Sequence, residues 1–299
     1  MSTFRTKAPL GVSAIATTLL LLATSACSQG EANGSGEFRY EPAATADPNA
    51  RARFVELVGE SDEVISALRS ELDACLNPLG FEYIGAPAVP FDIYKLGGFM
   101  PPLPVEQARA SGYGETREFL ASRNGSDDDS VKPGYVEALW GPEKDLKTVS
   151  VTLGGATTEK ETGGCDSTAT SSVYGSPKNG LLASGVVFNV GLSVLTDVRA
   201  SGEVKEIAGE WSECMIAAGE PKYAAPFASY KDAENGKADE IKTAVADATC
   251  RASTDYESKY DDLIDRYITG FMEKYEPQLS EVEAIRADSE ERAREILGG

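Results

Sequence analysis

The stretch Trp211-Ser-Glu-Cys214-Met and the later stretch Ala246-Asp-Ala-Thr-Cys250 decide the fold of this chain. Apolar residues at spacings of three and four lead up to Cys214, which is the period of one helix face. From 239 to 275 a stripe of aliphatic and aromatic residues continues at helical spacing. The pattern predicts two helices with one cysteine each, the second running unbroken over 239–275 and ending at Pro277.

An earlier segment repeats the pattern of the first helix. In both copies a cysteine ends an apolar stripe of three-four-three spacing, a large apolar residue follows, and a glycine stands five positions after the cysteine. The two stripes are Ile65, Leu68, Leu72, Cys75 and Val204, Ile207, Trp211, Cys214. A weak internal duplication over 61–165 and 200–250 therefore suggests the disulfides Cys75–Cys165 and Cys214–Cys250. Four cysteines permit three pairings, so this pairing is a hypothesis.

The N-terminus has the form of an export signal. A basic start precedes an apolar run over 10–22, which is too short for a comfortable membrane span, and small residues follow. Leu22-Ala-Thr-Ser-Ala26-Cys27 resembles the lipobox of bacterial lipoproteins, although Thr24 stands where leucine is usual. The resemblance implies cleavage after 26, acyl chains on Cys27 and a flexible tether over 27–48. The alternative is a secreted protein in which Cys27 forms a disulfide.

Composition narrows the function. The 299 residues include 48 acidic and 28 basic side chains, for a net charge of -20, which disfavours nucleic acid and anionic lipid surfaces as partners. No histidine occurs, which removes the Ser/His and Cys/His catalytic pairs and nearly all ordinary zinc sites. With 41% hydrophobic residues, the chain can still bury an ordinary core.

The remaining pattern predicts a mainly α fold over 49–299, with disulfide-stapled helical hairpins, a small β element and long Pro/Gly-rich loops. We expect one helix from 49 and a second that begins after the N-cap Ser61. Further helices are expected over 105–111, 116–122, 134–140 and 181–198. A charged helix over 278–297 either docks back on the domain or lies free. The alternating segment 147–153 predicts a strand, and paired glycines predict a mobile loop that delivers Cys165.

Two loops offer weak ligand sites. The segment 85–104 holds five prolines and the aromatics Phe91, Tyr94 and Phe99, which line a groove or, as we favour, pin the loop to the core. The turn 124–130 carries three consecutive carboxylates, but it lacks the ligand spacing of a calcium loop and reads as solvated. We therefore assign no metal, no cofactor and no catalytic residue.

Several short motifs resemble a group of uncharacterised actinobacterial lipoproteins. They are Trp211-Ser-x-Cys214-Met-x3-Gly219, Ala246-Asp-x2-Cys250, Gly112-Tyr-Gly114 after Val105-Glu, Ala138-Leu-Trp-Gly141 and Gly163-Gly-Cys165, scattered between about 72 and 251. Glu220 departs from the group, which usually has an aromatic residue there. The resemblance implies a helical, disulfide-bonded extracytoplasmic protein of unknown activity, and it carries over no catalytic residues.

Three functions fit, and we rank them in this order. The first is a non-enzymatic lipoprotein on the outer face of the cytoplasmic membrane, held by Cys27, that binds an envelope protein or a cell-wall component. The second is a solute-binding lipoprotein of a transporter, which would require repeated βαβ units. The third is a hydrolase that uses carboxylates alone, for which the sequence nominates no pair.

Overall fold

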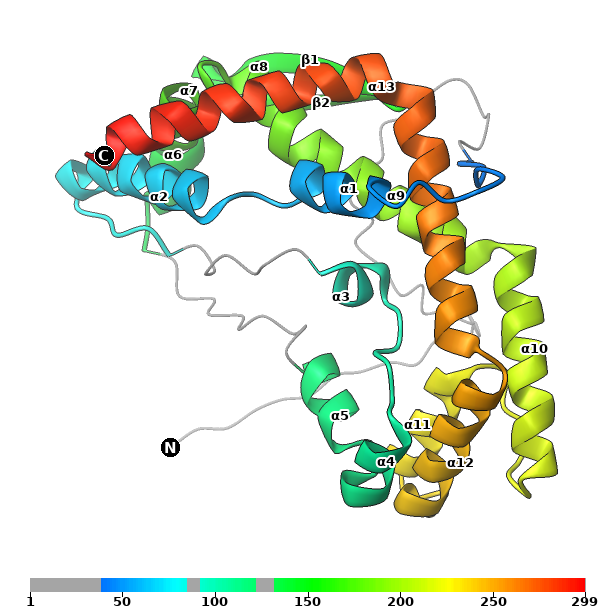
Figure 1. The fold of residues 1–299 in the computed structure, drawn as a ribbon. Coiled ribbons are helices and arrows are strands. Elements are labelled where there is room, and N and C mark those ends of the chain that lie inside the picture. The colour runs from blue at the N-terminus through cyan, green and yellow to red at the C-terminus, as the bar shows by residue number, and fades with distance from the viewer. Residues whose placement is uncertain (1–38, 85–91, 122–131, 299) are drawn as a thin grey trace, which may run out of the picture. The chain divides into compact units, whose positions relative to one another are not determined.

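The computed structural model describes residues 39–84, 92–121 and 132–298, and these form a mainly α-helical fold with one small sheet, as predicted (Figure 1). In chain order the elements are α1 (Ala50–Val58), α2 (Asp62–Leu76), the 3-10 turn η1 (Asn77–Leu79), α3 (Ile93–Gly97), α4 (Val105–Ser111), α5 (Gly114–Ala121), α6 (Tyr135–Trp140), the 3-10 turn η2 (Glu143–Asp145), β1 (Lys147–Leu153), β2 (Ala156–Thr162), α7 (Gly164–Tyr174), α8 (Pro177–Gly180), the π-helical turn η3 (Leu181–Val186), α9 (Val187–Ala200), α10 (Gly202–Ala217), α11 (Pro226–Glu234), α12 (Glu240–Ser253) and α13 (Tyr256–Ile296).

Many of these elements lie where local sequence signals placed them. The hydroxyl of Ser61 accepts the backbone N–H of Val64 and caps α2, and α4 and β1 have the predicted bounds. The apolar segment from 181 is helical, with the π-helical turn η3 leading into α9. Caps and hydrophobic periodicity therefore determine this part of the fold.

The prediction of a mobile loop before Cys165 was wrong. Residues 156–162 form β2, which pairs antiparallel with β1 from Leu153–Ala156 to Lys147–Thr162. Gly154 and Gly155 have φ values of 61° and 79°, the left-handed geometry that a two-residue hairpin turn requires. The polar sequence of β2 lacks the alternation expected of a half-buried strand, so the strand was missed.

The single helix predicted over 239–275 is also wrong. α12 ends at Ser253, and Asp255 adopts a left-handed φ of 53° before α13 begins at Tyr256. α13 then continues through Pro277, with non-helical dihedrals at Tyr275 (φ -113°, ψ 16°). Proline bends this helix instead of ending it, because it removes one hydrogen bond of the ladder.

The C-terminal half of α13 docks on the fold, which decides between the two alternatives for 278–297. Leu279, Val282 and Ala293 are buried. Arg286 donates to the carbonyl of Gly59, after α1, and at 2.8 Å to the carbonyl of Ala183 in η3. One arginine thus joins α13 to the end of α1 and to the π-helical turn.

The core lies around α13, which contacts α1, α2, α7, α9, α10 and α12 (Figure 1). The segment Pro177–Ala200 behind it is, among the described residues, long and apolar enough to cross a membrane, yet 56% of its apolar window is buried within the fold. Val187, Val194 and Leu195 on this segment are fully buried. It therefore serves as a core helix of the folded part.

Residues 39–48, which the sequence assigns to the tether, pack on the helices as a strap. Tyr40 is buried edge-on against Phe271 and Tyr275, and its backbone N–H donates to Asp197 at 2.8 Å. Further along, the backbone N–H of Ala43 donates to the carbonyl of Arg266 at 2.9 Å. The packed part of the chain therefore begins no later than Tyr40.

Candidate functional site

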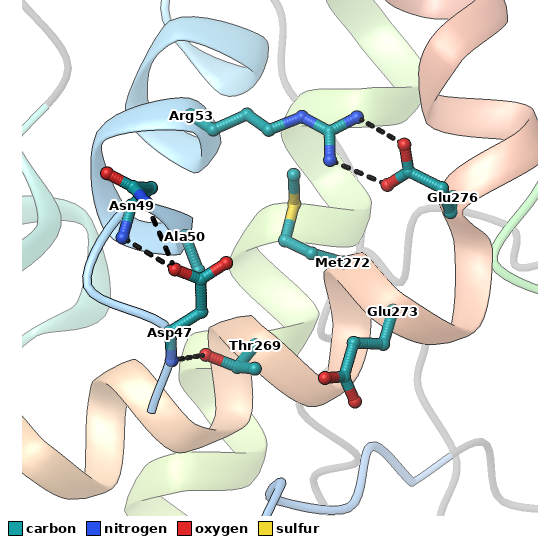
Figure 2. Close-up of a pocket in the computed structure, with 8 residues that line it drawn as sticks. All are labelled: Asp47, Asn49, Ala50, Arg53, Thr269, Met272, Glu273 and Glu276. Atoms are coloured by element: carbon teal, nitrogen blue, oxygen red, sulfur yellow. Dashed lines mark hydrogen bonds and ion pairs between the residues drawn. The ribbon is translucent and has the colours of Figure 1, made fainter. Parts of the chain in front are cut away.

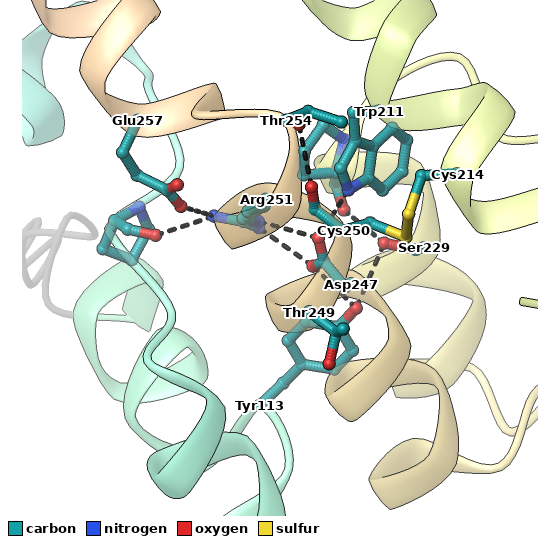
Figure 3. Close-up of polar contacts among 12 residues, drawn as sticks. Tyr113, Trp211, Cys214, Ser229, Asp247, Thr249, Cys250, Arg251, Thr254 and Glu257 are labelled. Atoms are coloured by element: carbon teal, nitrogen blue, oxygen red, sulfur yellow. Dashed lines mark hydrogen bonds and ion pairs between the residues drawn. A yellow bond between two sulfur atoms is a disulfide. The ribbon is translucent and has the colours of Figure 1, made fainter.

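A buried polar network joins the motifs of the two cysteine helices. Asp247 of α12 is fully buried and accepts the indole N–H of Trp211 on α10 at 2.9 Å. It also accepts the hydroxyl of Tyr113, which stands between α4 and α5, at 2.9 Å. That hydroxyl lies 3.1 Å from the hydroxyl of Ser229 on α11 (Figure 3). One carboxylate thus binds side chains from two other segments directly, and it reaches α11 through the hydroxyl of Tyr113.

Arg251, one turn further along α12, neutralises this carboxylate. Its Nε donates to Oδ1 of Asp247 at 2.7 Å and its Nη2 donates to Oδ2 at 2.9 Å. Its Nη1 donates to the carbonyl of Pro101 at 3.1 Å and faces Glu257 at 3.5 Å (Figure 3). Burial would lower the pKa of Arg251, but the charge of Asp247 outweighs it, so this pKa is raised and the guanidinium stays charged.

The network is closed to ligands. Trp211, Asp247, Arg251 and Tyr113 are each 1% exposed or less, and both carboxylate oxygens already accept two hydrogen bonds. Burial and then Asp247 raise the pKa of Tyr113, so its hydroxyl remains a donor. A buried ion pair whose hydrogen bonds are complete fixes the packing of its elements, and it leaves no group to bind a substrate.

The other motifs meet around the disulfide Cys75–Cys165. Cys75 on α2 is bonded to Cys165 in the first turn of α7, and α6 packs on the same helix. A Cβ at Gly164 would lie 2.4 Å from the backbone nitrogen of Gly141, and one at Gly163 would lie 2.7 Å from the carbonyl of Trp140. Glycine is therefore required where the two backbones touch, which explains both glycine motifs.

The two helices that carry Cys75 and Cys214 end in the same way. Gly80 and Gly219 have φ values of 86° and 82°. In each case the glycine N–H donates to the carbonyl three residues back, and the next N–H donates to the carbonyl five residues back, at 3.0 to 3.2 Å. This is a Schellman ending. The second cysteines differ, because Cys165 begins α7 whereas Cys250 lies in the last turn of α12.

The disulfides in the structure are Cys75–Cys165 and Cys214–Cys250, the pairs that the duplication suggested.

Among the other predicted sites, Cys27 and the turn 124–130 lie outside the described residues. The proline-rich segment is described from 92, and there Phe99 is buried against Tyr260, while the hydroxyl of Tyr94 donates to Asp261 at 2.6 Å. These two aromatics pin the segment to α13, which is the alternative we favoured; Phe91 is not described.

Glu220 is buried just after the end of α10. It accepts the hydroxyl of Thr243 at 3.0 Å and pairs with the ammonium of Lys242 at 2.7 Å. The hydrogen bond with Glu220 raises the pKa of Lys242. The carboxylate therefore ties the end of α10 to the first turn of α12.

A groove of about 300 Å³ lies between the strap, the start of α1 and α13 (Figure 2). Its lining side chains are Asp47, Asn49, Ala50, Arg53, Thr269, Met272, Glu273 and Glu276. The guanidinium of Arg53 donates to Glu276 at 2.6 and 3.0 Å and to Glu283 at 2.5 Å. The hydrogen bond with Arg53 lowers the pKa of Glu276, so that carboxyl stays ionised.

No known family model, curated protein or solved structure matches this chain. Among the described residues, no group of three or more cysteine or acidic side chains is placed to hold a metal ion.

The sequence pointed to Trp211 and the cysteines, but the roles of Tyr113, Asp247 and Arg251 were not predicted from it. The available signal was their position inside or directly beside the short motifs, since the motif residues meet in the folded chain.

Proposed function

We propose that this chain is a lipid-anchored extracytoplasmic protein that binds another component of the cell envelope and carries out no reaction itself. The pair of disulfides carries the proposal. Each bridge closes one of the two clusters in which the motifs meet, Cys75–Cys165 beside α6 and Cys214–Cys250 beside the Asp247 network. Disulfides of this kind persist in oxidising compartments, which agrees with the export signal and with acylation of Cys27.

A binding role is supported by how the polar motif residues are used. Asp247 and Arg251 bond to each other and to neighbouring helices, so they stabilise a framework. In the groove, Glu276 has a lowered pKa, whereas a carboxyl acting as general acid needs a raised one. The solute-binding alternative requires βαβ units, and the described residues contain one two-stranded antiparallel sheet.

The anchor is tested first. Mass spectrometry of the mature protein from its native host should show an N-terminal Cys27 that carries acyl chains, and a Cys27→Ser variant should leave the membrane fraction. The matched control is Ser28→Ala, which should remain anchored. An unmodified Cys27 within a membrane-free mature protein would contradict the proposal.

Partner binding is tested on intact cells. Chemical crosslinking with the anchored wild type, followed by affinity capture and mass spectrometry, should yield a specific envelope protein or a wall fragment. The Cys27→Ser variant, which should fold but leave the membrane, serves as the comparison. If no product depends on anchoring, and the purified chain instead hydrolyses a wall polymer, the binding role is wrong.

A further inference from the structure

The register of the hairpin shows which backbone groups of β2 point away from β1. Leu153 pairs with Ala156 across a two-residue turn, and this pair exchanges both of its backbone hydrogen bonds. Every second pair along the two strands does the same, because hydrogen-bonded and non-hydrogen-bonded pairs alternate in an antiparallel ladder. Ala156, Thr158, Lys160 and Thr162 direct their N–H and C=O groups to β1. Thr157, Glu159 and Glu161 direct theirs to the outer edge. The described residues form no backbone hydrogen bond to that edge.

Side chains alternate along β2 between a face that lies against the fold and a face that is exposed. Lys160 turns toward the fold, where its ammonium lies 3.0 Å from Asp166 and 5.2 Å from the ring of Trp140, and Thr162 beyond it is buried. Thr157, Glu159 and Glu161 are exposed. Within the described part of the chain, no ion pair involves either glutamate. With respect to the described residues, the outer edge therefore combines backbone groups that have no hydrogen-bond partner with two negative charges that have no ion-pair partner.

We propose that the outer edge of β2 docks an extended segment of another protein that carries lysine or arginine at alternate positions. The segment adds a third strand, its backbone bonding to Thr157, Glu159 and Glu161 while its cations lie opposite the two glutamates. This inference rests on the proposed binding role and names the partner's chemistry.

Charge selects a basic partner over a second copy of the chain. Two β2 edges paired antiparallel about Glu159 would place Glu159 directly opposite its own copy, and like charges at that spacing destabilise a sheet. The net charge of -20 adds a long-range repulsion between copies and an attraction for a basic segment. Charged residues on an edge strand also prevent unselective pairing.

The test uses the full mature chain in detergent and a short peptide with lysine alternating with threonine and valine. Amide hydrogen exchange should show that the backbone N–H groups of Thr157, Glu159 and Glu161 exchange quickly in the free protein and slow when the peptide binds. Those of Thr158 and Lys160 should be protected throughout. A peptide with glutamate in place of lysine should not bind.

Two double variants distinguish binding at the outer edge of β2 from a general attraction of the peptide to an acidic protein. Glu159→Lys with Glu161→Lys should weaken peptide binding by about tenfold, because two cross-strand attractions become repulsions. The control, Glu137→Lys with Glu143→Lys, makes the same charge change at exposed positions off the strand and should bind as wild type. Equal losses in both variants, binding without protection of the three amides, or no binding to the wild type would each overturn the inference.

Crosslinking on cells separates this inference from the binding role itself. If the wild type and the Glu159→Lys, Glu161→Lys variant capture the same partner equally well, the partner does not dock at the outer edge of β2. The proposed binding role would then stand without this inference. If the isolated chain protects its edge amides with the peptide but captures nothing on cells, the edge stands and the proposed envelope role fails.

Discussion

Arg251 donates hydrogen bonds to both carboxylate oxygens of Asp247, which lies one helical turn earlier, at 2.7 and 2.9 Å (Figure 3). Both side chains are almost fully buried. The same carboxylate receives the indole of Trp211 and the hydroxyl of Tyr113. α12 therefore holds α10 and the α4–α5 junction through a single charged group. This arrangement makes Asp247 the residue whose loss should disturb the most elements.

Asp247→Ala should destabilise the protein by about 3–5 kcal/mol, because it leaves the buried charge of Arg251 without its main partner. Urea unfolding of the oxidised protein, followed by circular dichroism, measures the change. The control is Glu106→Ala, which removes an exposed ion pair with Arg109 and should change stability by less than about 0.5 kcal/mol. Similar values for the two variants would show that the network contributes no more than a surface pair.

Removing either disulfide should also destabilise the protein, and the loops they close set the order. The sequence separations are 90 for Cys75–Cys165 and 36 for Cys214–Cys250. The chain-entropy model gives about 4.6 and about 3.8 kcal/mol for loops of these lengths. Double cysteine-to-alanine variants of each pair, compared by urea unfolding, test this order, and non-reducing peptide maps test the pairing. A map that links Cys75 to Cys214 would contradict it.

The sequence was sufficient where local signals act alone. The hydroxyl of Ser61, the proline after Asn77 and the apolar stripe to Cys75 define α2 without help from the rest of the chain. The same holds for the stripe that ends at Cys214. In these segments hydrophobic period, caps and stop signals agree, so the fold class and the cysteine helices were predictable.

Other features depend on contacts between distant residues. Asp255 takes a left-handed conformation that glycine usually supplies, so no residue type marked the break between α12 and α13. Pro277 stays within a helix whose far half is held by burial of Leu279 and Val282. The carboxylate of Asp247 could not be chosen among 48 acidic residues until its partners were placed around it.

The strap fits against α13 because residue 270 has no side chain. A Cβ at Gly270 would lie 2.3 Å from the carbonyl oxygen of Glu41. Gly270→Ala should therefore displace the strap and cost about 1–3 kcal/mol, and limited proteolysis should cut 39–48 faster. Gly209→Ala is the control, since nothing lies within 4 Å of its Cβ, and it should stabilise α10 by about 0.4–1 kcal/mol. Equal protease resistance of Gly270→Ala and wild type would refute the close fit.

The strap should also loosen at alkaline pH through Tyr40. Burial, with smaller contributions from Tyr275 and Asp197, raises the pKa of Tyr40 to about 12, above the usual value near 10. The neutral phenol is favoured in the fold, so its contribution is complete below about pH 10 and is lost as pH rises through 12. Thermal unfolding of wild type and Tyr40→Phe should show wild type losing more stability between pH 10 and 12, while a difference titration at the phenolate absorbance places one group near 12. Identical pH profiles for the two proteins would mean that Tyr40 ionises as freely in the folded chain as in the unfolded one.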